Sequence, residues 1–333
     1  MKLSPLIYIA YCLLFFALLL LGFWTSLFTW SSFPISAMDA IQGLLSPSED
    51  AIAQHIVHDI RLPRALLAAT VGACFAAAGV VMQGLTQNPL ASPAVLGVNA
   101  GAALGMAAVS TITPWFGLLG ISMAAMIGGG VAWTLVMILG SAWRGGSDTG
   151  RLVLAGVAIS ALCAAFTKAL VIMEEDQASA VLSWLAGSFA NGNWETWSLF
   201  WPVALFALIA SQLLTPTLNL LQLGDDNAQN LGISLIWTKL AGSVLVLILV
   251  GSAIGASGSI GFVGLLVPHM ARILCGQDHR YFLPLSMLMG SALVVLADTL
   301  SRGIIFPLET PAGAILALIG APFFIYLVKK RAS

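Results

Sequence analysis

Apolar runs of about 20 residues recur along the whole chain, and they constrain the fold more than any other feature. The runs are continuous, whereas strands of a membrane barrel would show alternating segments of about ten residues. In hydrocarbon, only helices and closed barrels satisfy their own backbone hydrogen bonds. The pattern therefore predicts an all-α, polytopic transmembrane bundle of about ten spans. These spans are expected at 6–28, 64–85, 93–112, 115–140, 151–173, 197–216, 236–256, 262–275, 281–300 and 311–328.

Composition agrees with this pattern. Hydrophobic residues make up 59% of the 333 residues and charged residues only 8%, whereas soluble domains carry about 25% charged residues. Many runs are rich in Gly and Ala, which lets helix backbones approach closely. The longest interruption, 29–62, is too short for a separate domain, and the first run is too long for a cleaved signal peptide. Residues 1–333 are therefore expected to form a single transmembrane domain.

The positions of Lys and Arg predict the orientation, because cytoplasmic loops of membrane proteins are enriched in both. With the N-terminus inside, nine of the thirteen basic residues fall at cytoplasmic ends, and the acidic loop 174–176 faces outward. Ten spans also return the C-terminus to the cytoplasm. The nine residues are Lys2, Arg144, Arg151, Lys239, Arg272, Arg280, Lys329, Lys330 and Arg331.

Three arginines, Arg61, Arg64 and Arg302, fall on the outer side against this trend. Pro63 suits the first turn of a helix, so the first two would lie at the mouth of the second span. One interpretation is structural: interfacial anchoring, or a pair between Arg302 and Asp298 one helical turn away. The other interpretation is an outward docking surface for carboxylates of a partner protein.

The inward loop 218–232 contains a candidate short helix. Asp225 is a suitable N-cap and Gly232 a suitable terminator. A helix of two turns is unstable alone in water, so it must pack on something. It either packs on its own bundle or enters a groove of another protein, and in the second case the small Ala228 is expected to face that partner.

Two further segments are irregular. Asn88, Pro89 and Leu90 lie between two spans, and Pro89 and Pro93 together forbid a continuous helix there. This segment is either a gate or an ordinary tight loop. Glycines punctuate 254–272, so the chain is expected to bend or break within that stretch.

Patterns for catalysis or cofactor binding are missing from the sequence. There is no Ser/His/Asp arrangement, HExxH motif or Walker motif. The four cysteines are scattered singly, and His269 has no second ligand at helical spacing. The chain is therefore expected not to be an enzyme and to bind no metal or cofactor. It could not use ATP without a partner.

Several motifs resemble the FecCD/BtuC-type permeases, and the resemblance runs essentially from end to end. The similar segments are 61–64 (RLPR), Gln83 with 88–93 (NPLASP), 96–99 (LGVN), 154–158 (LAGVA), 184–188 (WLAGS), 261–269 (GFVGLLVPH), Asp298 with Arg302, and 312–323. The stretch 23–36 is most similar to the iron(III)-dicitrate branch of the family.

The resemblance implies a type II ABC importer permease in the bacterial inner membrane. Its substrate would be an iron(III)-siderophore of the citrate type, with cobalamin or haem as alternatives. The implied partners are a second permease subunit in a homodimer or, as the favoured alternative, a heterodimer, two ATPase subunits that use ATP, a periplasmic binding protein and membrane lipid, with no nucleic acid.

The resemblance also implies roles for individual residues. Arg61, Arg64 and Arg302 would meet glutamates of the binding protein. Asn88, Pro89 and Leu90 would form a cytoplasmic gate, and the loop Ser147-Asp148-Thr149 would lie near a second gate. The coupling segment that enters the ATPase would contain Gly224, Asp225, Ala228, Leu231 and Gly232.

Two classes compete with this interpretation. An ion-coupled secondary transporter or channel would favour paired ionisable residues in the middle of the bilayer, where Lys168 is the only candidate. An intramembrane enzyme would need a nucleophile or a metal-binding cluster, and the sequence shows neither.

Overall fold

A computed structural model of the chain describes residues 4–45, 51–112, 117–140, 149–173 and 184–332, and helices make up most of them. No strand beyond one isolated bridge occurs within these ranges. The helices in chain order are α1 (Pro5–Phe28), α2 (Ala37–Leu45), α3 (Ile52–His55), the π-helix η1 (Ile56–Arg61), α4 (Leu62–Thr86), α5 (Val98–Ile112), α6 (Gly117–Leu139), α7 (Thr149–Met173), α9 (Trp194–Leu213), α10 (Thr215–Leu221), α11 (Asp225–Asn230), α12 (Leu235–Ser257), α13 (Val263–Cys275), α14 (His279–Gly303) and α15 (Ala312–Ala332).

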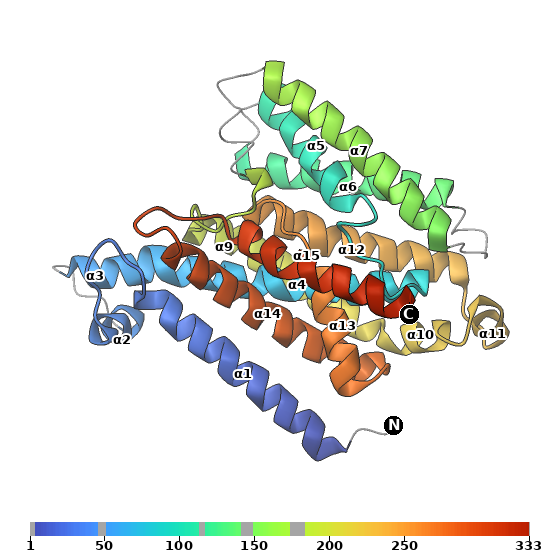
Figure 1. Cartoon of the computed structure of the whole chain (residues 1–333), viewed down its shortest axis with the longest axis horizontal. Helices are drawn as coiled ribbons and strands as arrows, with labels where there is room; N and C mark the ends of the chain where they lie inside the picture. The colour runs from blue at the N-terminus through green and yellow to red at the C-terminus, as the bar shows by residue number, and fades with distance from the viewer. Residues whose placement is uncertain (1–3, 46–50, 113–116, 141–148, 174–183, 333) are drawn as a thin grey trace.

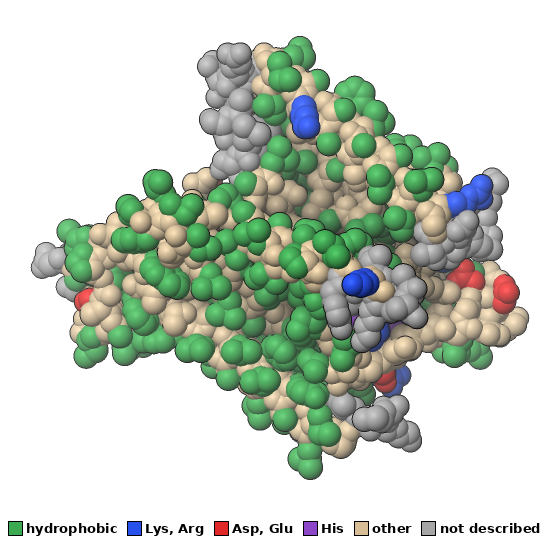
Figure 2. All heavy atoms as spheres, viewed as in Figure 1, with side chains coloured by type: hydrophobic (Ala, Val, Ile, Leu, Met, Phe, Trp, Pro, Cys, Tyr) green, Lys and Arg blue, Asp and Glu red, His purple; other side chains and the backbone are tan. Residues whose placement is uncertain are grey.

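The prediction of an all-α, polytopic bundle is confirmed. Within the described ranges, seven helices are long and apolar enough to cross a membrane. Three shorter apolar stretches, Val98–Thr111, Val263–Cys275 and Ala312–Ile325, coincide with the remaining predicted spans. Figure 2 shows hydrophobic side chains over most of the visible face, which suits contact with lipid.

Helix α4 lies at the centre of the bundle, where it packs against α14, α12 and α13. It is buried along nearly its whole length because small residues let neighbouring backbones approach closely. A Cβ atom added at Gly72 would collide with the backbone of Gly290, and one added at Gly79 would collide with Gly264. The Gly- and Ala-rich composition therefore serves tight helix contacts, as the sequence predicts.

Helices α5, α6 and α7 pack on one another and form a second group, at the top of Figure 1. This group joins the central helices mainly through contacts of α6 and α5 with α12. On the other side of the bundle, α1 packs along α14.

The predicted break within 254–272 is confirmed. Helix α12 ends at Ser257 and α13 begins at Val263, with positive φ at Gly258 (75°) and Phe262 (66°). The connecting backbone is bonded to the chain around Trp184, whose carbonyl accepts from the Ser259 N–H at 3.2 Å. Irregular backbone inside a membrane protein is tolerated where protein surrounds it in this way.

The interruption 29–62 contains three short helices that no sequence pattern predicts. Helices α2, α3 and η1 fold against the C-terminal end of α1, around the fully buried Leu27, Ala40 and Val57. The π-helical turns lead directly into α4, where Pro63 occupies the first turn as predicted.

The two ends of the bundle differ. The chain termini and α11 lie at one end, and α2 and α3 lie at the other. The sequence predicts both termini on the same side of the membrane, and in the fold both lie toward the same end of the bundle (Figure 1). The acidic loop 174–176 lies outside the described residues.

Candidate functional site

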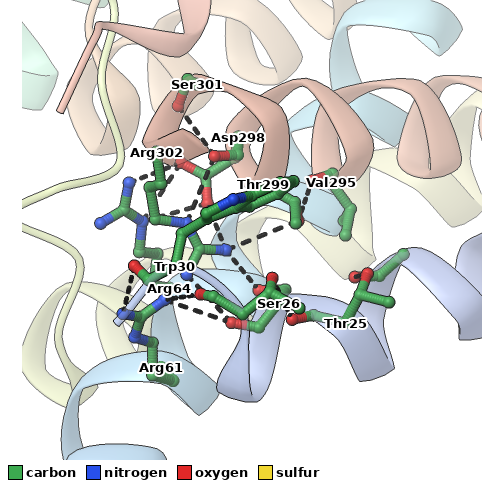
Figure 3. A network of polar contacts seen from close by, with 12 residues as sticks. Thr25, Ser26, Trp30, Arg61, Arg64, Val295, Asp298, Thr299, Ser301 and Arg302 are labelled. Carbon is green, nitrogen blue, oxygen red and sulfur yellow. Dashed lines mark hydrogen bonds and ion pairs between the residues drawn. The ribbon is translucent and has the colours of Figure 1, made fainter. Parts of the chain in front are cut away.

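At the end that carries α2 and α3, Arg64 is the centre of a buried ion network (Figure 3). Its Nε and Nη2 atoms donate to the Asp298 carboxylate at 2.8–3.1 Å. Its Nη1 atom donates to Glu309 Oε2 at 2.8 Å. The side chains of Arg64 and Asp298 are 5% and 1% exposed, whereas that of Glu309 is 39% exposed. One guanidinium group thus ties α4 to α14 and to the loop that follows α14.

Arg302 and Arg61 attach the end of α1 to the same network. Arg302 donates through Nη1 and Nη2 to the backbone and side-chain oxygens of Ser26, both at 3.0 Å. Its Nη2 atom also lies 3.6 Å from Asp298 Oδ2, one helical turn away. Arg61 donates to the carbonyl oxygens of Ser26, Thr29 and Trp30 at 3.2–3.5 Å. The three arginines therefore hold α1, α4 and α14 together.

The side chains of Arg61, Arg64 and Arg302 are all buried rather than exposed on the surface, although they lie at the end of the bundle that carries α2 and α3. Asp298 is the reason for Arg64 and Arg302, because a carboxylate inside α14 provides the counter-charge that a buried arginine needs. Arg61 is buried against backbone carbonyl oxygens instead. The pair between Asp298 and Arg302, which is the structural interpretation of these residues, is present. What the sequence missed is the pairing of Arg64 with Asp298, which are 234 positions apart. A docking role for this end stays a prediction.

At the opposite end, α11 is a six-residue helix between two glycines with positive φ, Gly224 (97°) and Gly232 (88°). Gly232 ends the helix as predicted. Asp225 does not act as the N-cap, because Gly224 occupies that position. Instead the Asp225 carboxylate accepts from Lys239 Nζ at 2.7 Å and from Gln87 Nε2 at 2.8 Å. It therefore joins α11 to α12 and to the end of α4.

Ala228 does not face a partner, so that expectation is wrong. It is fully buried within this chain and belongs to the main hydrophobic core together with Leu218 and Leu221. The helix is too short to be stable alone, and it gains its stability by burying this face on its own bundle. Two leucines that flank this helix are exposed at the surface of the chain: Leu231 is 59% exposed and Leu223 is 55% exposed. These two leucines, rather than Ala228, are available to another protein.

The segment after α4 is irregular, as its prolines predict. Gln87 ends α4 in the left-handed conformation, with φ 49°. The Asn88 side chain then accepts from the Leu90 N–H at 2.9 Å and is 2% exposed. The bond from Gln87 to Asp225 connects this turn to α11, a contact between residues 138 positions apart. Of the proposed second gate, Ser147 and Asp148 lie outside the described residues.

Among the described residues, no group of three or more His, Cys, Asp or Glu side chains is arranged to hold a metal ion. The bundle of long apolar helices, with the described ion pairs toward its two ends, defines the class of this protein: an α-helical, polytopic membrane protein.

Comparison with known proteins narrows this class. The model of the FecCD transport family matches residues 18–330. The chain therefore belongs to the FecCD transport family.

Two relatives and one solved structure illustrate the similarity. The Fe(3+) dicitrate transport system permease protein FecC of Escherichia coli is 44% identical over 317 residues, which cover 95% of each chain. The hemin transport system permease protein HmuU of Yersinia pestis is 41% identical over 292 residues, 83% of this chain and 84% of that protein. A metal-chelate type ABC transporter in an inward-facing conformation superposes with a TM-score of 0.81 and 32% identity, over 96% of this chain and 98% of that chain.

Proposed function

We propose that this chain is the membrane-spanning subunit of an ATP-driven importer that carries an iron(III) chelate of the citrate type across the bacterial inner membrane. The observation that carries the proposal is the 44% identity to the dicitrate permease over 95% of both chains. A haem permease is the second candidate, because its relative is 41% identical, but over a smaller part of the chain.

The proposed assembly contains a second permease subunit in a heterodimer, two ATPase subunits and a periplasmic binding protein. ATP would bind the ATPase subunits and not this chain. Both termini would face the cytoplasm, in keeping with their common end in the fold (Figure 1). The charge bias of the sequence supports this orientation.

The end with the arginine network would then meet the binding protein. In this network three guanidinium groups surround two carboxylates, which leaves one positive charge unbalanced. A carboxylate of the binding protein would balance that charge. Glu309 is the exposed member of the network, so an approaching carboxylate would compete with it for Arg64.

The end with α11 would meet the ATPase subunits. The exposed Leu231 and Leu223 offer an apolar contact, and the buried Ala228 anchors the helix on its own chain. Through Asp225 and Gln87, a displacement of α11 would reach the turn at Asn88, Pro89 and Leu90, which we propose as the cytoplasmic gate.

Uptake into proteoliposomes tests the proposal. The chain is reconstituted with its companion permease, ATPase and binding protein, and radiolabelled iron–citrate is offered together with ATP. We expect ATP-dependent uptake of iron–citrate and little uptake of hemin or cobalamin. A complex whose ATPase lacks its nucleotide-binding lysine serves as the control and should be inactive. Preferential uptake of hemin would show that the substrate is haem and not iron–citrate. Uptake without any ATPase would overturn the ATP-driven mechanism.

A further inference from the structure

A polar cavity of about 320 Å³ opens between the end of α4, the end of α10 and the α13–α14 connection. This volume falls within the size of typical ligand pockets. Its polar lining consists of Gln83, Gln87, Gln222, Arg272, Gln277 and His279. The described residues that line it contain one arginine and no carboxylate, so the lining favours an anion.

Gln83 is the buried donor of this cavity. Its Oε1 atom accepts from Arg272 Nη2 at 2.6 Å, and this bond determines which end of the amide is oxygen. The Nε2 atom is therefore the end of the amide that remains to donate elsewhere. It is buried and has no hydrogen-bond partner among the described residues, although Gln83 as a whole is only 3% exposed. A buried donor without a partner costs free energy unless a ligand or water accepts from it.

Arg272 supplies the positive charge. Its guanidinium carbon lies 5.1 Å from the centre of the Phe282 ring, and its Nη2 atom is held by Gln83. Stacking and hydrogen bonding together fix the orientation of the planar group. A fixed guanidinium beside an amide N–H suits planar or tetrahedral oxyanions, which accept several hydrogen bonds at once.

We propose that this cavity binds an oxyanion group, a carboxylate or a phosphate, of a small polar ligand, with Gln83 Nε2 as the buried donor and Arg272 as the charge. The inference does not rest on the proposed transport function, since binding can be measured on the purified chain alone.

Substitution of Gln83 by Glu tests the site, because the two side chains have the same size. Glu keeps an oxygen for Arg272 and replaces the N–H donor with a negatively charged oxygen. Binding of citrate and of inorganic phosphate to the detergent-purified chain is measured by calorimetry. We expect binding in the low millimolar range or tighter for the wild type, and a loss of at least about tenfold in Q83E. The melting temperature of Q83E should not fall, because the bond to Arg272 becomes an ion pair.

Gln277→Glu is the matched control, since it adds the same charge to the cavity lining and leaves the buried donor in place. It should weaken binding by less than about threefold.

Gln83→Met, which removes the donor without adding charge, replaces Q83E if that variant does not fold. Citrate binding alone identifies a carboxylate site, and phosphate binding alone identifies a phosphate site. The inference is overturned if neither anion binds the wild type up to about 10 mM. It is also overturned if the Gln83 variants bind as well as wild type, or if Q277E loses as much affinity as Q83E.

Discussion

The buried carboxylate of Asp298 is the counter-charge of two arginines, Arg64 and Arg302. Asp298 lies inside α14 with a side chain 1% exposed, between Arg64 on one side and Arg302 on the other. A buried charge is tolerated only when it is paired and hydrogen-bonded. Because Asp298 pairs with both arginines, all three residues are internal, and ion pairs add to the apolar cluster of Leu27, Ala40 and Val57 in holding this end of the bundle.

Replacing Asp298 by Asn should destabilise the isolated chain strongly. The change leaves two buried guanidinium groups without their shared counter-charge, which typically costs about 3–5 kcal/mol. Unfolding of the detergent-purified protein, followed by circular dichroism, measures the loss. Glu309→Gln is the control, because this exposed partner of Arg64 should cost less than about 1 kcal/mol. If both variants lost the same free energy of unfolding, burial of the carboxylate would not determine how much it stabilises the chain.

The same network affects how docking can be tested. A glutamate in place of Arg64 would face the buried Asp298, so loss of uptake in that variant would report misfolding as well as docking. Glu309→Gln separates the two effects, since it removes the competing carboxylate and leaves Arg64 paired with Asp298. We expect tighter binding of the binding protein to this variant, measured by titration of the reconstituted complex. Weaker binding would instead show that Glu309 helps to form the docking surface.

At the scale of elements, α11 shows why a short helix can be stable at the surface. It has only six residues, yet Ala228 is buried in the main core, and Asp225 is bonded to both α12 and α4. These tertiary contacts replace the hydrogen bonds and packing that a helix of this length lacks. A force applied to the exposed side of α11 would therefore be transmitted to the bundle.

Ala228→Trp should destabilise the permease even without its partners. The indole would have to enter a site that Ala228 already fills, and overpacking of this kind costs about 1–3 kcal/mol or more. Thermal melting of the isolated chain measures the effect. The neighbouring Gln229 is exposed, so Gln229→Trp should melt like wild type. A stable A228W protein that fails only to bind the ATPase would instead show that Ala228 faces the partner.

Asp225→Ala should uncouple ATP hydrolysis from uptake. The substitution removes the bonds to Gln87 and Lys239, and with them the described side-chain link between α11 and the turn at 88–90. We expect ATP hydrolysis by the assembled complex to continue while uptake falls by about tenfold, which corresponds to about 1.4 kcal/mol of lost coupling. Asp226→Ala is the matched control and should leave uptake unchanged, because Asp226 is adjacent, equally charged and exposed. Normal uptake in D225A would show that Asp225 is not needed to couple ATP hydrolysis to uptake.

At the scale of the whole molecule, the ion pairs of the described residues lie toward the two ends of the bundle. The visible face between the ends is mostly hydrophobic in Figure 2. The arginine network occupies one end, and α11, the polar cavity and the chain termini occupy the other (Figure 1). This distribution suits a protein whose middle contacts lipid and whose ends contact proteins in water.

Labelling of single cysteines tests the orientation. Met38 on α2 is 61% exposed, and Gln229 on α11 is exposed at the opposite end. A membrane-impermeant maleimide should label M38C in right-side-out vesicles and Q229C only in inverted vesicles. Wild-type chain provides the background, because three of its four cysteines are buried. The reverse pattern would contradict a cytoplasmic location of both termini.

The sequence by itself determined the class of fold, the positions of the spans and the break near Gly258. These features follow from local properties, since apolar length, glycine conformation and proline geometry act on residues close together in the chain. The family is also visible in the sequence, because its motifs occur in order along the chain.

Only the tertiary structure decided how the charged residues pair and which faces of short elements are free. Arg64 meets Asp298 across 234 positions, Gln87 meets Asp225 across 138, and Ala228 turns inward although its helix carries mostly polar residues. The physical reason is that burying an arginine or ordering a six-residue helix is unfavourable until a partner from elsewhere in the chain compensates. That partner is supplied by the packing of α4 against α14 and α12, which no local sequence pattern specifies.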